Sequence, residues 1–285
     1  MCSLSKGKIA TVIKSTSKNI FENLAFEEYL FRTHNVEKSG ELLLIWSNQP
    51  CVVIGRHQNL WLEVNQKFTR KNNIEIARRH SGGGAVYHDL GNLNISLLTT
   101  HAQHCRPKNL KFISESINNR YRALKIEPNS RDDMELLPGN RKCSGTAARI
   151  AKGQAYHHLT LLVDANLENL KNALKSDLAE RIETNATRSV RAKKVGFLRE
   201  DDVNCEVEEV KETIIEAYKN LFTSTSTITE NPAELIKSTP EIAKILEDLK
   251  SWQWIYGKSP KFVYDTKIHV KNGICEETGQ RFEEF

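Results

Sequence analysis

The chain has 285 residues, a length that suits one large domain with a sizeable core, or one domain with a small appendage. Its content of 39% hydrophobic and 27% charged residues is typical of a folded globular protein and argues against disorder. The net charge of +5 is mild, no apolar run approaches the roughly 20 residues that span a bilayer, and no nucleic-acid-binding motif is present. These properties exclude membranes and nucleic acids as expected partners.

The six cysteines are widely spaced and show no paired metal-ligand spacing. This pattern predicts free thiols in a reducing compartment, with no structural disulfide and no bound zinc. The segment from Met1 to Asn19 is rich in lysine and serine and has no acidic residue, as in organelle transit segments. It lacks arginine, however, and already contains a strand pattern, so a complete transit peptide is not expected.

In chain order, the first predicted elements are a strand over Ile9–Ile13 and a helix that begins after Ser17 as N-cap and ends near Phe31. The β-prone runs Leu42–Trp46 and Cys51–Ile54 are divided by turn residues, a pattern that predicts a hairpin. The elements expected next are a short helix at Phe68–Asn72, a strand near Ile74–Ala77 and, after a glycine-rich segment, an alternating strand over Leu93–Leu97.

The second half of the chain continues to mix helices and strands. The predicted elements are a helix at Leu110–Leu124, strands at Met134–Leu137, Lys142–Ser144 and Tyr156–Val163, helices at Leu167–Leu174 and Val207–Leu221, a polar connector or edge strand at Thr223–Thr229, and a helix at Pro240–Trp254. There is no regular βαβ alternation. The order therefore predicts an α/β (α+β) fold with a mixed, largely antiparallel sheet and flanking helices.

The most informative stretch is Arg78-Arg79-His80-Ser81-Gly82-Gly83-Gly84, which leads into Ala85-Val86-Tyr87-His88-Asp89. Three consecutive glycines between two strands are entropically unfavourable, and packing gives no reason for them. They allow close approach of the backbone to a ligand, with N–H groups directed at an anion, and the two arginines can add charge-assisted bonds. The alternative is a flexible loop, because the segment is neither a Walker loop nor a dinucleotide fingerprint.

Two later stretches also carry polar residues suited to chemistry. Lys142 stands at a strand edge before small residues, a pattern that suits a cation placed against a phosphoryl or carbonyl oxygen. His158 opens an apolar strand. Taken alone, the lysine is typical of a solvated surface residue and the histidine of a satisfied core residue. Cys143 faces away from Lys142 in an extended strand, which favours core packing over a nucleophilic role.

The ordered combination of these stretches resembles the signature of the lipoate–protein ligase and lipoyltransferase family, and is similar to the mitochondrial lipoyltransferases of animals. The matching segments are Arg78–Asn92, Lys142–Ala147 and His158–Leu162, together with Asn23–Glu27, Cys51–Arg56 and Trp252–Gly257. The resemblance implies a strongly bent mixed sheet shared with biotin–protein ligases, and a mitochondrial location. It also implies a catalytic domain over residues 1–262, with 263–285 as a truncated start of the family's C-terminal accessory domain.

The resemblance also implies a site for lipoyl-adenylate, in which Lys142 is the catalytic residue and holds the carbonyl and phosphate oxygens of the mixed anhydride. The adenylate would be bound by Arg79, Gly82, Gly83, Gly84, Ala85, Val86, Tyr87, Arg131, Lys142, Thr160, Thr187 and Ser189, and the site would also be lined by Gly55, His88 and His158. An apolar tunnel for the acyl chain is expected from Leu24, Trp46 and Val86. No protein metal site is implied, and Mg²⁺ would be required only if the chain itself adenylates lipoate.

The function implied by the resemblance is transfer of a lipoyl group from lipoyl-AMP, or a related guanylate, to a lysine of an acceptor protein. Expected acceptors are the acidic lipoyl domains of the glycine-cleavage H protein and of 2-oxoacid dehydrogenase acyltransferase subunits, and the chain is expected to be a monomer. Amidotransfer between acceptors and complete ligation with lipoate and ATP or GTP remain alternatives. A different class of function is a non-catalytic module that binds lipoyl groups or acceptors.

Overall fold

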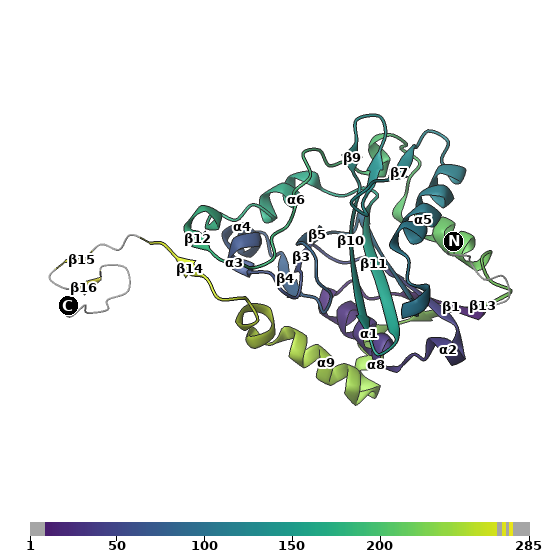
Figure 1. Cartoon of the computed structure of the whole chain (residues 1–285), viewed down its shortest axis with the longest axis horizontal. Coiled ribbons are helices and arrows are strands. Elements are labelled where there is room, and N and C mark those ends of the chain that lie inside the picture. The colour runs from purple at the N-terminus through teal and green to yellow at the C-terminus, as the bar shows by residue number, and fades with distance from the viewer. Residues whose placement is uncertain (1–8, 267–269, 272–273, 276–285) are drawn as a thin grey trace.

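The computed structural model describes residues 9–266, 270–271 and 274–275 (Figure 1). Its central feature is a six-stranded sheet in the order β10-β11-β6-β2-β1-β13. The strands are β10 (Ser144–Ala151), β11 (Gln154–Leu162), β6 (Asn92–Thr100), β2 (Glu41–Trp46), β1 (Ile9–Ser15) and β13 (Ser224–Glu230). Pairing is antiparallel from β10 to β2 and parallel from β2 through β1 to β13. The predicted mixed sheet with flanking helices is confirmed, and the Thr223–Thr229 stretch is an edge strand.

Helices cover both faces of this sheet. One layer contains α1 (Ile20–Thr33), α8 (Pro232–Ser238) and α9 (Pro240–Lys250), and the other contains α5 (Arg106–Arg120) and α7 (Val207–Lys219) (Figure 1). Alternate residues of β2 enter different cores: Leu44 packs with the α1 and α9 side, and Leu43 with the α5 and α7 side. A strand buried on both faces is apolar at every position, which explains the continuous Leu42–Trp46 run.

Smaller sheets flank the central one. The first contains β3 (Cys51–Ile54) between β4 (Glu75–Arg78) and β5 (Val86–His88), and the second contains β7 (Ile126–Pro128), β8 (Met134–Leu136) and β9 (Arg141–Lys142). Further elements are α2 (Val36–Ser39), α3 (Leu60–Glu63), α4 (Gln66–Lys71), α6 (Leu167–Ala173), the pair β12 (Ile182–Glu183) and β14 (Val263–Tyr264), and the pair β15 (Val270–Lys271) and β16 (Ile274–Cys275). No helix within the described residues has the length and apolar character needed to cross a bilayer.

The predicted hairpin between Leu42–Trp46 and Cys51–Ile54 is wrong. β2 pairs with β1 and β6, whereas β3 pairs with β4 and β5 in a different sheet. Each run is apolar because nearly every position, on both faces of the strand, is buried. The residues between them therefore turn the chain from one sheet into the next.

Helix boundaries also differ from the predictions. The helix predicted at Leu110–Leu124 begins and ends four residues earlier, as α5. Asn19 is the N-cap of α1, because its side chain accepts hydrogen bonds from the N–H groups of Phe21 and Glu22. The Ser17 hydroxyl instead accepts from the Asn19 N–H and donates to the Glu22 carboxylate. The predicted Pro240–Trp254 helix is divided into α9 and a π-helical turn at Gln253–Gly257.

This π-helical turn is joined to the β4-β3-β5 sheet by Arg78, which ends β4 and has a fully buried side chain. Its guanidinium donates to the carbonyls of Trp254, Ile255, Gly55, Arg56 and Gln58 and to the Ser259 hydroxyl. In return, the indole Nε1 of Trp254 donates to the Arg78 carbonyl at 2.7 Å. Arg78 therefore connects segments some 180 residues apart in the chain.

We expect Arg78→Met to lower the free energy of unfolding by about 3 kcal/mol or more, because several buried carbonyls lose their donor at once. Urea denaturation followed by circular dichroism measures the change. Arg131→Met is a matched control, because Arg131 is exposed, and it should alter stability by no more than about 0.5 kcal/mol. Equal stability of the two variants would contradict the role given to Arg78.

Candidate active site

The glycine-rich loop joins β4 to β5 and lies between the end of β3 and strand β10. Gly83 has φ 85°, in the left-handed region that favours glycine. A Cβ atom added to Gly83 would lie 3.4 Å from the Cβ of Ala147 on β10, and one added to Gly55 would lie 2.1 Å from the Gly83 carbonyl oxygen. The close approach at Gly55 excludes every other residue unless the loop moves.

The buried side chain of Arg79 fixes the shape of this loop. Its Nε donates to the Ser81 hydroxyl and its Nη1 to the Val53 carbonyl, and its Nη2 donates to the carbonyls of Gly82 and Gly84. Burial lowers the pKa of Arg79 to about 10, so the group remains cationic at neutral pH. The two arginines expected to bind an anion thus donate to protein acceptors, although Arg79 also lines a cavity.

Lys142 lies on β9, immediately before β10. Its Nζ donates to Oδ2 of Asp133 at 2.6 Å, and its side chain lines a cavity of about 560 Å³. The next residue, Cys143, is fully buried in the core on the α5 side, and burial raises the pKa of its thiol to about 12. Core packing of Cys143 is therefore confirmed, and the described cysteines Cys51, Cys105, Cys143 and Cys205 are free thiols.

Two cavities meet at β10 and β11. The larger is bordered by many cations, namely Lys142, Lys171, Lys175, Arg191 and Lys193, and by Ala85, Val86 and Tyr87 of the loop. The smaller is a slot of about 40 Å³ whose walls include Leu24, Trp46, Val53, Val86, Arg79, His88, Ala147 and His158. The two share Val86, Gly145 and Thr160 as lining residues. The expected tunnel residues Leu24, Trp46 and Val86 thus lie together beside the cavity that contains Lys142.

Thr160 and His158 stand on β11 beneath the loop. The Thr160 hydroxyl accepts the Gly145 N–H at 2.9 Å. His158 connects two other elements, because its Nε2 is 2.8 Å from the Ser81 hydroxyl and its Nδ1 is 2.9 Å from a Glu27 carboxylate oxygen. Glu27 is buried in α1. It belongs to the matching segment Asn23–Glu27, but no role was predicted for it.

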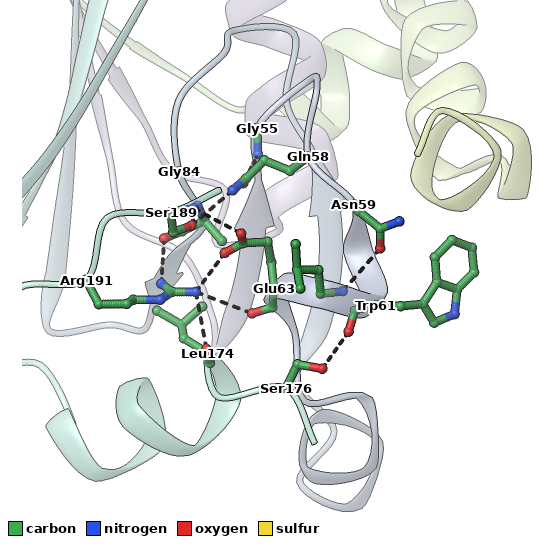
Figure 2. Close-up of polar contacts among 12 residues, drawn as sticks. Gly55, Gln58, Asn59, Trp61, Glu63, Gly84, Leu174, Ser176, Ser189 and Arg191 are labelled. Atoms are coloured by element: carbon green, nitrogen blue, oxygen red, sulfur yellow. Dashed lines mark hydrogen bonds and ion pairs between the residues drawn. The ribbon is translucent and has the colours of Figure 1, made fainter. Parts of the chain in front are cut away.

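The segment that contains Ser189 lies directly against the glycine-rich loop, as Figure 2 shows. The Ser189 hydroxyl accepts the Ala85 N–H at 2.7 Å and a Gln58 amide hydrogen at 3.0 Å. Buried Glu63 accepts the Ser189 N–H and pairs with Arg191, each at 2.9 Å. Glu63 and Arg191 were not predicted, since neither lies in a recognisable motif.

Several predicted site residues line neither cavity: Gly55, Gly82, Gly83, Gly84 and Ser189 belong to the glycine-rich loop or contact it, whereas Arg131 and Thr187 are exposed. Arg131 is exposed in the turn before β8, where its N–H donates to the Asn129 side chain. Thr187 is exposed two residues before Ser189. His88 lines the slot, and Gly55 supports the loop and donates its N–H to the Gln58 side chain. Most of the predicted residues therefore lie in or beside the two cavities. Arg131 and Thr187 lie at the periphery.

The comparison with known families supplies the decisive observation. Residues 19–219 match the model of the lipoyl protein ligase A/B catalytic domain. The chain belongs to this family. Among its relatives, the mitochondrial lipoyl amidotransferase LIPT1 of Mus musculus is 39% identical over 267 residues, which cover 91% of this chain and 68% of the mouse protein. Three predictions are thereby confirmed: the family, an enzyme of the lipoyltransferase class and, by resemblance, a mitochondrial location.

Solved structures agree on the fold. LipL1 of P. falciparum, in complex with lipoate, superposes with a TM-score of 0.75 at 24% identity, covering 94% of this chain and 82% of LipL1. A lipoate–protein ligase A bound with ATP gives a TM-score of 0.67 at 23% identity, with 89% of this chain and 100% of that one covered. At these identities the likeness demonstrates a common fold, and the predicted ligase-like catalytic fold is confirmed.

We expect Glu63→Ala to release the segment around Ser189, because both the Ser189 N–H and the Arg191 guanidinium lose their buried acceptor. Hydrogen exchange measured by mass spectrometry should become faster in peptides that cover residues 184–193. Ser176→Ala is the control, since Ser176 donates to the Trp61 carbonyl on the other side of α3. Unchanged exchange in the Glu63 variant would show that other contacts hold the segment.

Buried histidines predict loss of stability in acid. Burial is the largest cause that lowers the pKa values of His80, His88 and His157, each to about 3. These histidines bind protons in the unfolded chain near pH 6.5 but stay neutral in the fold, so stability is present above pH 6.5 and is lost as the pH falls.

Each such histidine should reduce the free energy of unfolding by about 1.4 kcal/mol per pH unit between roughly pH 6 and pH 4. Urea midpoints measured across this range test the prediction. His157→Gln should flatten the dependence, because His157 is completely buried and lines neither cavity. A wild-type midpoint that stays constant down to pH 5 would contradict it.

Proposed function

We propose that the chain transfers a lipoyl group from lipoyl-AMP, or a related nucleotide anhydride, to a lysine of an acceptor protein. The observation that carries the proposal is the common wall of the two cavities: Val86, Gly145 and Thr160 separate an apolar slot from a basic cavity. A lipoyl-nucleotide has the same two parts, an apolar chain and an anionic phosphate, joined at the acyl group. The reacting carbonyl would therefore lie at this wall, beside Lys142.

The charges around the larger cavity suit a phosphate. Five lysines and arginines line it, and no Asp or Glu is among the described residues of its wall. Lys142 pairs with Asp133 and Arg191 with Glu63 behind the wall, so the excess charge comes from Lys171, Lys175 and Lys193. Val86, on the loop, and Lys142 border the same space although they are some sixty residues apart in the sequence. A cavity lined by one sign of charge raises the local concentration of the opposite charge, which favours an anionic nucleotide there.

The proposed reaction requires stabilisation of developing negative charge. The acceptor ε-amine, in its neutral form, attacks the acyl carbon of the anhydride, and the C–O bond to the phosphate then breaks. Nucleoside monophosphate leaves with the bonding electron pair, and the nitrogen loses a proton to give the amide. The ammonium group of Lys142 would stabilise the carbonyl oxygen and the departing phosphate. A single such donor in other enzymes contributes about 10²–10³ in rate.

The remaining site assignments form part of the proposal. The loop residues Gly82, Gly83, Gly84, Ala85, Val86 and Tyr87, together with Arg79, Thr160 and Ser189, would surround the acyl-phosphate, while Arg131 and Thr187 would approach the nucleotide from the rim. Ser189 supports this arrangement because it already contacts the Ala85 N–H. Residues 1–262 would form the catalytic domain, and 263–285, which lie largely outside the described residues, the start of the accessory domain.

The donor is the point on which the alternatives differ. One structural neighbour contains lipoate and another contains ATP, which supports the use of lipoate and a nucleotide. The mouse relative is named a lipoyl amidotransferase, which supports amidotransfer from the H protein to acyltransferase subunits. In both reactions the acceptors would be acidic lipoyl domains. Mg²⁺ would be needed only if the chain adenylates lipoate itself.

Purified protein should therefore be incubated with one apo-acceptor domain and, in parallel, with lipoyl-AMP, with lipoate plus ATP and Mg²⁺, or with lipoylated H protein. Mass spectrometry of the acceptor measures the addition of one lipoyl group. We expect modification with lipoyl-AMP. Modification with lipoate plus ATP would favour complete ligation, transfer from lipoylated H protein would favour amidotransfer, and no modification with any donor would support a binding module instead.

Lys142→Ala should lower kcat for transfer from lipoyl-AMP by about 10²–10³, because the charge that stabilises the anhydride oxygens is removed. Lys244→Ala, an exposed lysine on α9, is the control and should match the wild type. Circular dichroism and the melting temperature establish that both variants are folded. A folded Lys142→Ala protein with normal kcat would refute the proposed mechanism.

A further inference from the structure

A buried row of polar side chains leads from the first strand to the apolar slot. It consists of Ser15 on β1, Asn23 on α1, Asn48 in the β2–β3 connection and His88 on β5. All four are buried. The Ser15 hydroxyl donates to Asn23 Oδ1 at 2.6 Å, and Asn23 Nδ2 donates to Asn48 Oδ1 at 2.9 Å. Asn48 Nδ2 is 2.9 Å from Nδ1 of His88.

The direction of every bond in this row follows from one backbone carbonyl. Asn23 Nδ2 also lies 3.0 Å from the Ser17 carbonyl oxygen, which can only accept a hydrogen bond. The orientation of the Asn23 amide is thereby fixed, and Asn48 must present its oxygen to Asn23 and its nitrogen to His88. Since the Asn48 amide nitrogen is a donor, Nδ1 of His88 must accept.

The proton of the neutral His88 ring therefore resides on Nε2. Burial, with the nearby Arg79 charge as the next cause, lowers the pKa of His88 to about 3, so the ring is neutral at physiological pH. Nε2 has no hydrogen-bond partner among the described residues, and the ring lines the slot. The indole Nε1 of Trp46, another lining residue, also lacks a partner within the described part of the chain.

We propose that the N–H groups of His88 and Trp46 select acyl chains that carry a hydrogen-bond acceptor within the slot, and so distinguish the dithiolane of lipoyl from a plain alkyl chain. This inference rests on the proposed function. Both donors are buried and unpaired within the described residues before any chain enters the slot, and a buried donor without a partner is unfavourable. The sulfur atoms of a dithiolane are weak acceptors and satisfy part of this requirement, whereas a methylene satisfies none.

Octanoyl-AMP is the matched probe, because its chain has the same eight carbons as lipoyl-AMP and no sulfur. The ratio of kcat/KM for transfer from lipoyl-AMP to that from octanoyl-AMP, with one acceptor, measures the selection. Wild-type protein should prefer lipoyl-AMP, and His88→Asn should reduce the ratio by about three- to tenfold, since one net hydrogen bond is lost. His88→Gln, whose longer amide can place an N–H near the Nε2 position, should keep more of the preference.

The tautomer of His88 can be tested without any activity. Nitrogen NMR shifts of ¹⁵N-histidine-labelled protein should show Nε2 protonated and Nδ1 unprotonated at pH 7. Asn48→Asp, which replaces the donor by an acceptor of the same size, should place a proton on Nδ1. A wild-type ring protonated on Nδ1 would overturn the inference, and so would an unchanged kcat/KM ratio in a folded His88→Asn protein.

The two proposals fail in different ways. If wild-type protein uses neither acyl-AMP, the proposed transfer reaction is wrong, and the NMR result still reports the His88 tautomer. If both donors are used and the ratio is the same in wild type, His88→Asn and His88→Gln, the transfer reaction stands and the selective role of His88 is wrong.

Discussion

The arrangement of the candidate site depends on the buried guanidinium of Arg79. It donates to the end of β3 through the Val53 carbonyl and to the glycine-rich loop through Ser81, Gly82 and Gly84. A loop of three glycines would otherwise sample many conformations. Because the Arg79 side chain bonds the loop internally, the loop keeps one shape against β10. In the proposed reaction, its polar groups would thus be oriented before a ligand binds, as electrostatic catalysis requires.

The adjacent residues Arg78 and Arg79 have the same side chain but contact different parts of the molecule. Successive side chains of an extended strand point to opposite sides. Arg78 and Arg79 accordingly reach different partners: Arg78 bonds the carbonyls around Ile255, and Arg79 bonds those of the loop. Sequence alone suggested that both would bind an anion. Their donors are instead engaged by backbone carbonyls and serine hydroxyls, and Arg191 pairs with Glu63, so the excess positive charge of the larger cavity comes from lysines.

Prediction from sequence was most successful where chemistry constrains residue types. The motifs specific to the family predicted that the loop and Lys142 lie close together. The resemblance also led to the expectation that Leu24, Trp46 and Val86 line one apolar space. The pairing of β2 and β3 could not be predicted, because a turn such as Asn48-Gln49-Pro50 looks the same whether the second strand folds back or enters another sheet. Glu63 and Arg191 were missed because their partners are distant in sequence.

The connection between Arg78 and the turn at Gln253–Gly257 has a consequence for synthesis on the ribosome. Strand β4 emerges early, yet the carbonyls of Trp254 and Ile255 that bond its arginine are made about 175 residues later. Similarly, β1 receives its parallel neighbour β13 only after residue 224. Contacts of such long sequence separation slow folding. The nascent chain therefore has to keep a charged side chain hydrated until nearly the whole domain has left the exit tunnel.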